Sequence, residues 1–205
     1  MKVREVLGRS DYALISELIP QGSRVLDLGC GDGALLAFLQ TSKGVDARGI
    51  EIKPELVQAA VARGVPVYQG DVENSLGEYP DAAFDCVILS QTVQETRRPL
   101  HVLTQMLRIG RHAIIAFPNF GHWRVRLSHL VSGRAPRTRL FPYNWHNSPN
   151  IHFLTLLDFE ELVREQGWGI ERRYFLSGHK RISELPNLRA EIAVYMLRNS
   201  PKTAD

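Results

Sequence analysis

The chain has 205 residues, of which 44% are hydrophobic and 23% are charged, and its formal net charge is +3 at pH 7. These values are typical of a soluble domain with a core of its own, and no apolar run comes near the ~18 residues that a membrane span requires. The segment Met1–Glu5 lacks the apolar stretch of a secretory signal, and Cys30 and Cys86 fall in segments typical of buried thiols, so we expect a cytoplasmic protein.

Hydrophobic residues recur with alternating helical and strand periods from residue 10 to residue 117. In chain order, this pattern predicts helices over 10–19, 34–39, 55–63 and 98–107, and strands over 24–28, 46–52, 66–70, 84–89 and 111–117. The apolar run Phe84–Leu89 is of the kind that a parallel sheet buries on both faces. Strands that alternate with helices in this way predict a doubly wound α/β sheet with right-handed crossovers.

The alternation stops after residue 117. The segment Pro118–Pro149 is rich in Arg, Pro, Asn and aromatic residues, and we expect it to form a short helix and a long irregular loop. A helix over 155–166, two β segments over 169–176 and 191–198, and a frayed tail over 201–205 complete the expected order. We therefore expect a single domain over residues 1–205 with an arginine- and aromatic-rich insert at about 118–152.

The segment Val25–Gly33 carries the clearest functional signal. A short apolar run with an embedded acid, Asp27, leads into three glycines at every second position, Gly29, Gly31 and Gly33, and an apolar helical segment follows at once. This order predicts a strand, a tight turn and a helix N-terminus, which is the geometry that brings a backbone close to a ligand. We therefore expect a nucleoside-bearing small molecule to bind here.

Two ligands fit this turn. The spacing Gly29-x-Gly31-x-x-Ala34, with Glu51 about 20 residues on, satisfies a loose dinucleotide-binding fingerprint. Three features favour S-adenosylmethionine instead. Asp27 can receive an ammonium group, Asp71 closes the third strand where it can accept from an adenine amino group, and the chain ends in two β segments rather than in a substrate domain.

Four segments together resemble class I S-adenosylmethionine-dependent methyltransferases: Val25–Gly33, Gly49–Ile52, Gly70–Val72 and Phe84–Leu89. The resemblance covers roughly residues 20 to 120. It implies a Rossmann-like fold with a seven-stranded, mostly parallel sheet whose last strand is antiparallel. It also implies that the first glycines approach the methionine part of the ligand, that Glu51 holds the ribose hydroxyls and that Asp71 reaches adenine. The candidate residues for binding S-adenosylmethionine or S-adenosylhomocysteine are Asp27, Gly29, Cys30, Gly31, Gly33, Glu51, Ile52, Asp71, Val72, Ser90 and Gln91.

A catalytic group is harder to assign. The segment Ser90–Glu95 contains neither the Asn/Asp-Pro-Pro-aromatic motif of enzymes that methylate amino groups on nucleic acid nor a His-containing pair. The candidates that remain are in the insert, and they are His122, Tyr143, His146 and His152. A lone loop histidine usually has a structural role, and no Cys/His cluster has metal-ligand spacing. The sequence thus assigns no catalytic residue and predicts no metal site.

The insert is the second distinctive feature of the chain. No Asp or Glu occurs from Thr96 to Leu157, whereas nine arginines fall in that stretch. Without these arginines, the rest of the chain has 16 basic and 22 acidic residues. Arginine interleaved with Trp, Tyr and Phe is typical of protein interfaces and also suits single-stranded nucleic acid. The insert has no lysine and the rest of the chain is acidic, so we expect no nucleic-acid partner; a solvated loop that packs its aromatic residues on its own sheet is the remaining alternative.

Three further segments, Ser90–Gln94, Phe117–Trp123 and Tyr143–His152, resemble the MetW family of methionine biosynthesis proteins, and this resemblance spans nearly the whole chain. It implies that this protein is a partner that homoserine O-acyltransferase (an acetyl- or succinyltransferase) requires for activity, within a hetero-oligomer. No methyl acceptor is firmly associated with the family. The insert is then a docking face. The alternative is an S-adenosylmethionine-dependent methyltransferase that uses Gln91 and insert residues to seat a small metabolite.

Overall fold

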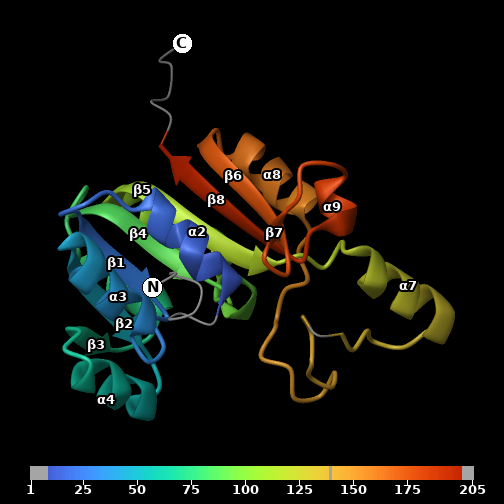
Figure 1. Ribbon diagram of the computed structural model, residues 1–205, viewed down its shortest axis with the longest axis horizontal. Helices are drawn as coiled ribbons and strands as arrows, with labels where there is room; N and C mark the ends of the chain where they lie inside the picture. The colour runs from blue at the N-terminus through green and yellow to red at the C-terminus, as the bar shows by residue number, and fades with distance from the viewer. Residues whose placement is uncertain (1–8, 139, 200–205) are drawn as a thin grey trace.

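The computed structural model describes residues 9–138 and 140–199 and contains an eight-stranded sheet with helices on both faces (Figure 1). The strand order is β3-β2-β1-β4-β5-β8-β6-β7. The five strands from β3 to β5 pair in parallel, and β8 lies antiparallel between β5 and β6. The strands are β1 (Arg24–Leu28), β2 (Asp46–Glu51), β3 (Val67–Gln69), β4 (Phe84–Ser90), β5 (Gly110–Pro118), β6 (Gly169–Ser177), β7 (Lys180–Arg181) and β8 (Ile192–Arg198).

The predicted α/β class, the mostly parallel sheet and the antiparallel last strand are confirmed, but the sheet has eight strands rather than seven. The additional strand is β7, which pairs with the end of β6 through Ser177 and Lys180. Gly178, with a φ of +55°, lies in the turn between them. A strand of two residues is too short to show a strand period, so β7 could not be predicted from the sequence. The predicted tail over 201–205 lies outside the described residues.

Two apolar layers hold the helices against the sheet. Along β4, Cys86 and Ile88 face a buried cluster with α2 and α3, whereas Val87 and Leu89 face a second cluster with α6 and α8. This alternation along a strand is what buries both faces of a parallel sheet. The helices are α2 (Ser10–Leu18), α3 (Ala34–Lys43), α4 (Pro54–Ala62), α5 (Val72–Ser75), α6 (Pro99–Ile109), α7 (Trp123–Ser132), α8 (Leu156–Glu165) and α9 (Pro186–Arg189), with 3-10 turns η1 (Leu76–Glu78) and η2 (Val93–Glu95).

Most predicted helices match these bounds within a few residues, and the short elements were missed. The helix expected over 34–39 continues to Lys43 before Gly44 ends it, and α5, η1 and α9 were not expected. Each missed helix has only three or four residues, which is about one helical turn. Over residues 9–138 and 140–199, no helix is long and apolar enough to cross a membrane.

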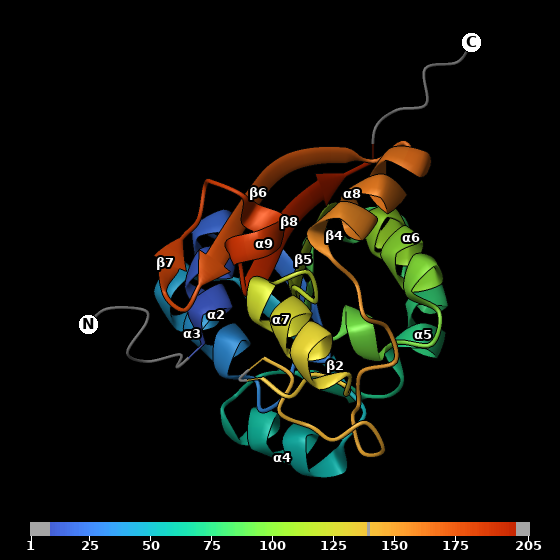
Figure 2. The same ribbon diagram turned by 90° about the vertical axis from the view of Figure 1, so that its right-hand side faces the viewer.

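The insert stands at the carboxyl edge of the sheet. It follows β5 directly, and Figure 2 shows α7 in front of the strand ends, whereas Figure 1 shows it projecting beyond them. As expected, it contains a short helix, and from Gly133 to Thr155 the described residues form turns and irregular backbone. The Asn119 side chain fixes its start, because it donates to the carbonyl oxygens of Asn187 and Ala190 at 3.0 and 2.9 Å and accepts from the Gly121 N–H.

Candidate functional site

Four parallel strands deliver the predicted site residues to one edge of the sheet. Asp27 lies near the end of β1, Glu51 ends β2, Asp71 follows β3 and Ser90 ends β4. The carboxyl ends of neighbouring parallel strands meet at the same edge, where open α/β sheets bind their ligands. The topology therefore brings together side chains that are dozens of residues apart in the sequence.

The glycine turn is closed by main-chain hydrogen bonds and leaves one open place. Gly29 N–H and Cys30 N–H both donate to the Ile50 carbonyl, at 2.8 and 3.1 Å. Gly29 has a φ of +73°, and a Cβ atom there would lie 2.9 Å from Thr92 Oγ1. A Cβ atom at Gly31 would meet nothing within 4 Å, so the backbone at Gly31 borders free space that a ligand can enter.

The other two turn residues have packing roles. A Cβ atom at Gly33 would lie 2.8 Å from the Ala60 Cβ, so this glycine lets the start of α3 approach α4. Cys30 is buried with its sulfur against Gly49, and burial raises the pKa of its thiol. Its side chain belongs to the core, and its sulfur also donates to the Gly31 carbonyl of the turn at 3.8 Å.

Glu51 fixes the shape of the turn from the neighbouring strand. Its buried carboxylate accepts from the Gly31 N–H at 2.9 Å and from the N–H groups of Ile52 and Lys53, both at 3.0 Å. One side chain thus links the glycine turn to the end of β2. This contact also places a carboxylate beside the open space at Gly31.

The residues predicted to contact the adenine base are more exposed than Glu51. Asp71 is exposed and caps α5, since its Oδ1 accepts from the Glu73 N–H at 2.9 Å, while Oδ2 takes only a 3.3 Å bond from Asn74 Nδ2. Val72 is half-buried, and the Ile52 side chain is 59% exposed. These apolar side chains leave surface at the ends of β2 and β3 that is free to contact a ligand.

Asp27 is the most unusual group at this edge. It is buried, and its Oδ1 has no hydrogen-bond partner among the residues that the structure describes. The pKa of the Asp27 carboxyl is raised to about 7, mainly by burial, while the positive charge of Arg9 opposes the rise and the negative charges of Asp11 and Glu51 add to it. A buried oxygen without a partner costs free energy, so this position favours a ligand that brings a donor, above all a cationic one.

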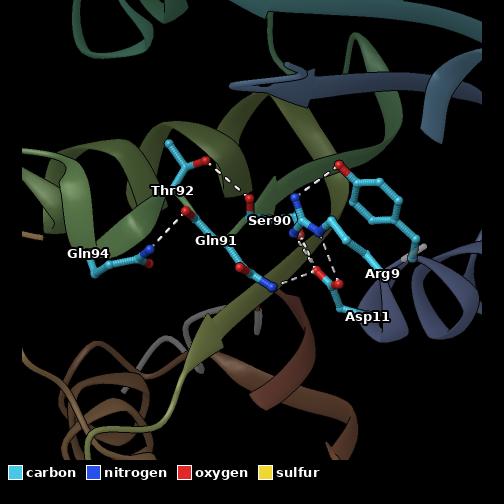
Figure 3. A network of polar contacts seen from close by, with 7 residues as sticks. Arg9, Asp11, Ser90, Gln91, Thr92 and Gln94 are labelled. Atoms are coloured by element: carbon cyan, nitrogen blue, oxygen red, sulfur yellow. Dashed lines mark hydrogen bonds and ion pairs between the residues drawn. The ribbon is translucent and has the colours of Figure 1, made fainter. Parts of the chain in front are cut away.

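The helix over 10–19 was predicted, but sequence reasoning missed the polar cluster that Arg9 and the start of α2 form with the end of β4 (Figure 3). Arg9 Nη2 donates to Asp11 Oδ2 at 2.6 Å and to Ser90 Oγ at 2.8 Å, and Ser90 Oγ donates to Asp11 Oδ2 at 2.6 Å. The Asp11 side chain is fully buried. No spacing rule connects residue 11 to residue 90, so the sequence carried no signal for this cluster.

A second set of contacts connects this edge to the insert. Gln91 has a φ of +55°, which is rare for a residue other than glycine, and its N–H donates to the Ala116 carbonyl at 2.7 Å. Gln94 Nε2 donates to the Gln91 carbonyl at 2.8 Å (Figure 3). The Gln94 carbonyl in turn accepts from the N–H groups of Ile151 and His152, at 2.8 and 3.0 Å.

The four candidate catalytic residues of the insert do not gather into one centre. His122 is buried and caps α7, because its Nδ1 accepts from the Arg124 N–H at 3.3 Å, and burial lowers its pKa. Tyr143 and His146 are exposed, and His152 is half-buried. In the described parts of the chain, none of the four is hydrogen-bonded to a carboxylate, and no group of three His, Cys, Asp or Glu residues has a metal-binding arrangement.

The insert contains a cavity of about 890 Å³ that is lined only by residues between Phe120 and Thr155. Phe120, Phe141 and Phe153 form a connected aromatic group in its wall, with ring centroids of successive pairs 5.1 and 4.7 Å apart. A smaller cavity of about 500 Å³ is lined by Arg134, Ala135, Arg137, Asn144 and Trp145. No residue of the glycine turn lines either cavity.

Residues 9–197 of the chain match the family described as "Methionine biosynthesis protein MetW". The chain belongs to the MetW family. The expected membership is thus confirmed, and with it the place of this chain among methionine biosynthesis proteins.

Named relatives agree with this assignment. The chain is 37% identical over 197 residues to a "Bifunctional methionine biosynthesis protein MetXA/MetW" of Rhodopirellula baltica, a match that covers 90% of this chain and 32% of that protein. It is 29% identical over 106 residues to a "Ubiquinone biosynthesis O-methyltransferase" of Photorhabdus laumondii, over 48% of this chain and 44% of the relative. The MetW chain therefore spans about a third of the first relative and less than half of the second.

Solved structures confirm the methyltransferase fold. A complex of the Haloferax volcanii Trm112 methyltransferase activator with a putative methyltransferase contains a chain similar to this one with a TM-score of 0.68 and 18% identity, over 100% of this chain and 90% of that chain. An S-adenosylmethionine-dependent methyltransferase from Archaeoglobus fulgidus gives a TM-score of 0.67 and 16% identity, over 96% and 97%. At these identities the likeness shows the fold of the MetW chain and no more.

Proposed function

We propose that this protein binds S-adenosylmethionine and is a partner that homoserine O-acyltransferase requires for activity. The observation that carries the proposal is the bifunctional MetXA/MetW relative, which matches 90% of this chain. We take its MetXA part to be the acyltransferase. Joining two units in one polypeptide keeps them at high effective concentration, which favours units that act together.

The residues at the glycine turn fit S-adenosylmethionine. The ligand carries an ammonium and a sulfonium, and Asp27 Oδ1 is a buried acceptor without a described partner. The open space at Gly31 leaves room beside Glu51. Asp27 would hold the ammonium, Glu51 the ribose hydroxyls and Asp71 the adenine amino group, with Ile52 and Val72 in apolar contact with the base.

The chemistry that the ligand supplies is a methyl group on a sulfonium, and nothing in the acyltransferase proposal consumes it. The chain's own contribution is to bind the ligand and to hold the turn. Glu51 fixes the backbone at Gly31, Arg9 and Asp11 set the charge around Asp27, and Ser90 is hydrogen-bonded to both of them. S-adenosylhomocysteine, which keeps the ammonium, ribose and adenine, fits the same contacts.

The deciding experiment is an acyltransferase assay with and without this protein, over a range of S-adenosylmethionine concentrations. We expect acyl transfer to homoserine to rise when the protein is added. Equal rates with and without it would refute the partner role.

Calorimetry tests the ligand site separately. Glu51→Ala should weaken S-adenosylmethionine binding at least several-fold, because the ribose contact and the order of the turn are both lost. Glu55→Ala, an exposed acid on α4, is the matched control and should bind as the wild type does. Equal affinity of wild type and Glu51→Ala would place the ligand elsewhere.

The cavity in the insert favours one second candidate, a methyltransferase that acts on a small metabolite. At about 890 Å³ it is large enough for a drug-sized molecule, and His129 and Tyr143 are among its lining residues. Under this alternative, S-adenosylhomocysteine is released from S-adenosylmethionine when a metabolite extract is added, and Asp27→Asn abolishes the release. No release from the wild type under these conditions would count against it.

A further inference from the structure

The insert arginines differ from the other arginines in their partners. Every ion pair found over residues 9–138 and 140–199 lies outside the insert, and most of the arginines outside the insert take part in one. Arg124, Arg126, Arg134 and Arg137 are all exposed, and none of them pairs with a carboxylate of the described chain. No Asp or Glu occurs from Thr96 to Leu157, and no described acid pairs with these arginines, so their charge is available to carboxylates of another molecule.

Apolar groups lie beside these arginines. Trp145 is 83% exposed, and together with Ala135 and Asn144 it lines both the large apolar cavity and the smaller one, which Arg134 and Arg137 also line. On α7, Leu130 is 82% and Val131 77% exposed. Large apolar side chains exposed next to one another mark interaction sites rather than ordinary surface.

We propose that this surface binds the acyltransferase by taking up an apolar side chain flanked by carboxylates. The apolar side chain enters the larger cavity beside Trp145, and the carboxylates meet Arg134 and Arg137. This inference rests on the proposed function and adds to it the place and the chemistry of recognition. An aromatic and arginine centre with an apolar pocket is the usual composition of an interface hot spot.

A protein fits this surface better than a nucleic acid or a small anion. Trp123, Tyr143 and Trp145 expose rings on which bases could stack, but the outer side chains Leu127, Leu130 and Val131 of α7 are aliphatic and offer a nucleic acid neither a ring nor a hydrogen-bond donor. They also extend the apolar area beyond the two cavities, which is more surface than a small anion covers.

The surface is also held in place before any partner arrives. Asn119 anchors its start to α9, the Gln94 carbonyl binds the N–H groups of Ile151 and His152 near its end, and Phe120 packs on Phe141 and Phe153 beneath it. A preformed site loses less conformational entropy on binding, which favours a stable complex.

The test measures the Kd of the full chain for the acyltransferase by calorimetry. The variants are Arg134→Glu with Arg137→Glu, and Trp145→Ala, and the control is Arg172→Glu, an exposed arginine of β6 outside the insert. We expect each insert variant to raise the Kd at least about tenfold and the control to change it less than about twofold. All altered side chains are exposed, and circular dichroism confirms that each variant is folded.

The outcomes separate the two proposals. If the wild type forms no complex with the acyltransferase, the proposed function falls and this inference falls with it. If the wild type binds and the insert variants bind equally well, only the docking site is overturned. If the arginine variant keeps its Kd for the acyltransferase but loses binding to a single-stranded RNA oligonucleotide, the surface serves a nucleic acid and the inference is also overturned.

Discussion

At the scale of single residues, Asp27 combines burial with a missing partner. Its Oδ1 lacks a donor among the described residues, and burial raises the pKa of its carboxyl to about 7. A carboxyl whose pKa is higher in the folded than in the unfolded chain stabilises the fold when it is protonated, and this contribution is lost as the pH rises through the folded pKa. The stability of the fold therefore depends on pH through this residue.

We predict that the free energy of unfolding of the wild type falls from pH 4 to pH 7, relative to that of Asp27→Asn. The slope attributable to Asp27 is at most about 1.4 kcal/mol for each pH unit, and it disappears above pH 7. Urea denaturation at several pH values measures it. Parallel pH profiles of the two proteins would show that Asp27 keeps an ordinary pKa.

Glu51 stabilises the fold through hydrogen bonds, since its buried carboxylate accepts from three main-chain N–H groups. We predict that Glu51→Gln lowers the free energy of unfolding by about 1–3 kcal/mol, because the amide has one acceptor oxygen and turns an NH₂ group toward the donors. Urea denaturation at pH 7 measures the loss. The exposed Glu55→Gln control should change stability by less than about 0.5 kcal/mol.

At the scale of elements, the insert depends on α9, a helix of four residues that comes 67 residues after the anchoring Asn119. The Asn119 side chain is fully buried and all three of its hydrogen bonds go to main-chain groups. The segment Pro118–Trp123 therefore has a structural role that its sequence did not reveal: its asparagine joins two loops at the carboxyl edge.

We predict that Asn119→Ala makes the insert accessible to proteases, with cleavage between residues 133 and 150 at least several-fold faster than in the wild type. The reason is that two buried carbonyl groups and one N–H lose their partner. Limited proteolysis followed by mass spectrometry maps the cuts, and the exposed Asn74→Ala is the control. Unchanged cleavage would mean that the contacts of Gln94 and Phe120 hold the insert without Asn119.

At the scale of the whole molecule, charge is divided between two regions. The stretch from Thr96 to Leu157 is basic and free of acids, whereas the remainder has 16 basic and 22 acidic residues. The acidic groups Asp11, Asp27 and Glu51 gather at the glycine turn, and four exposed arginines without an ion pair among the described residues, Arg124, Arg126, Arg134 and Arg137, lie on the insert. A cationic ligand and an acidic partner can thus bind one molecule at separate places.

This division predicts that the complex with the acyltransferase is sensitive to salt. Raising NaCl from ~0.05 to ~0.5 M should weaken the wild-type complex at least several-fold, because exposed charges are screened within a few ångströms at high salt. The Arg134→Glu, Arg137→Glu variant should lose most of this dependence. Calorimetric Kd values across the salt range decide it, and a wild-type Kd independent of salt would contradict an electrostatic contact.

The sequence by itself determined the strand order in the chain, the glycine turn, the insert and the family. These features depend on local periodicity, on turn residues and on motifs that neighbouring residues carry, so they are visible without coordinates. The prediction from sequence missed elements of two to four residues, such as β7, α5 and α9.

Only the tertiary structure decided what surrounds the site. Arg9 and Asp11 meet Ser90 across 81 and 79 positions of sequence, and the crossovers of the sheet, not any spacing, bring them together. The same holds for Asp27, since its acidity is set by the apolar layers packed around it and by three charges from other segments. Burial and long-range charge belong to the folded molecule, so no motif encodes them.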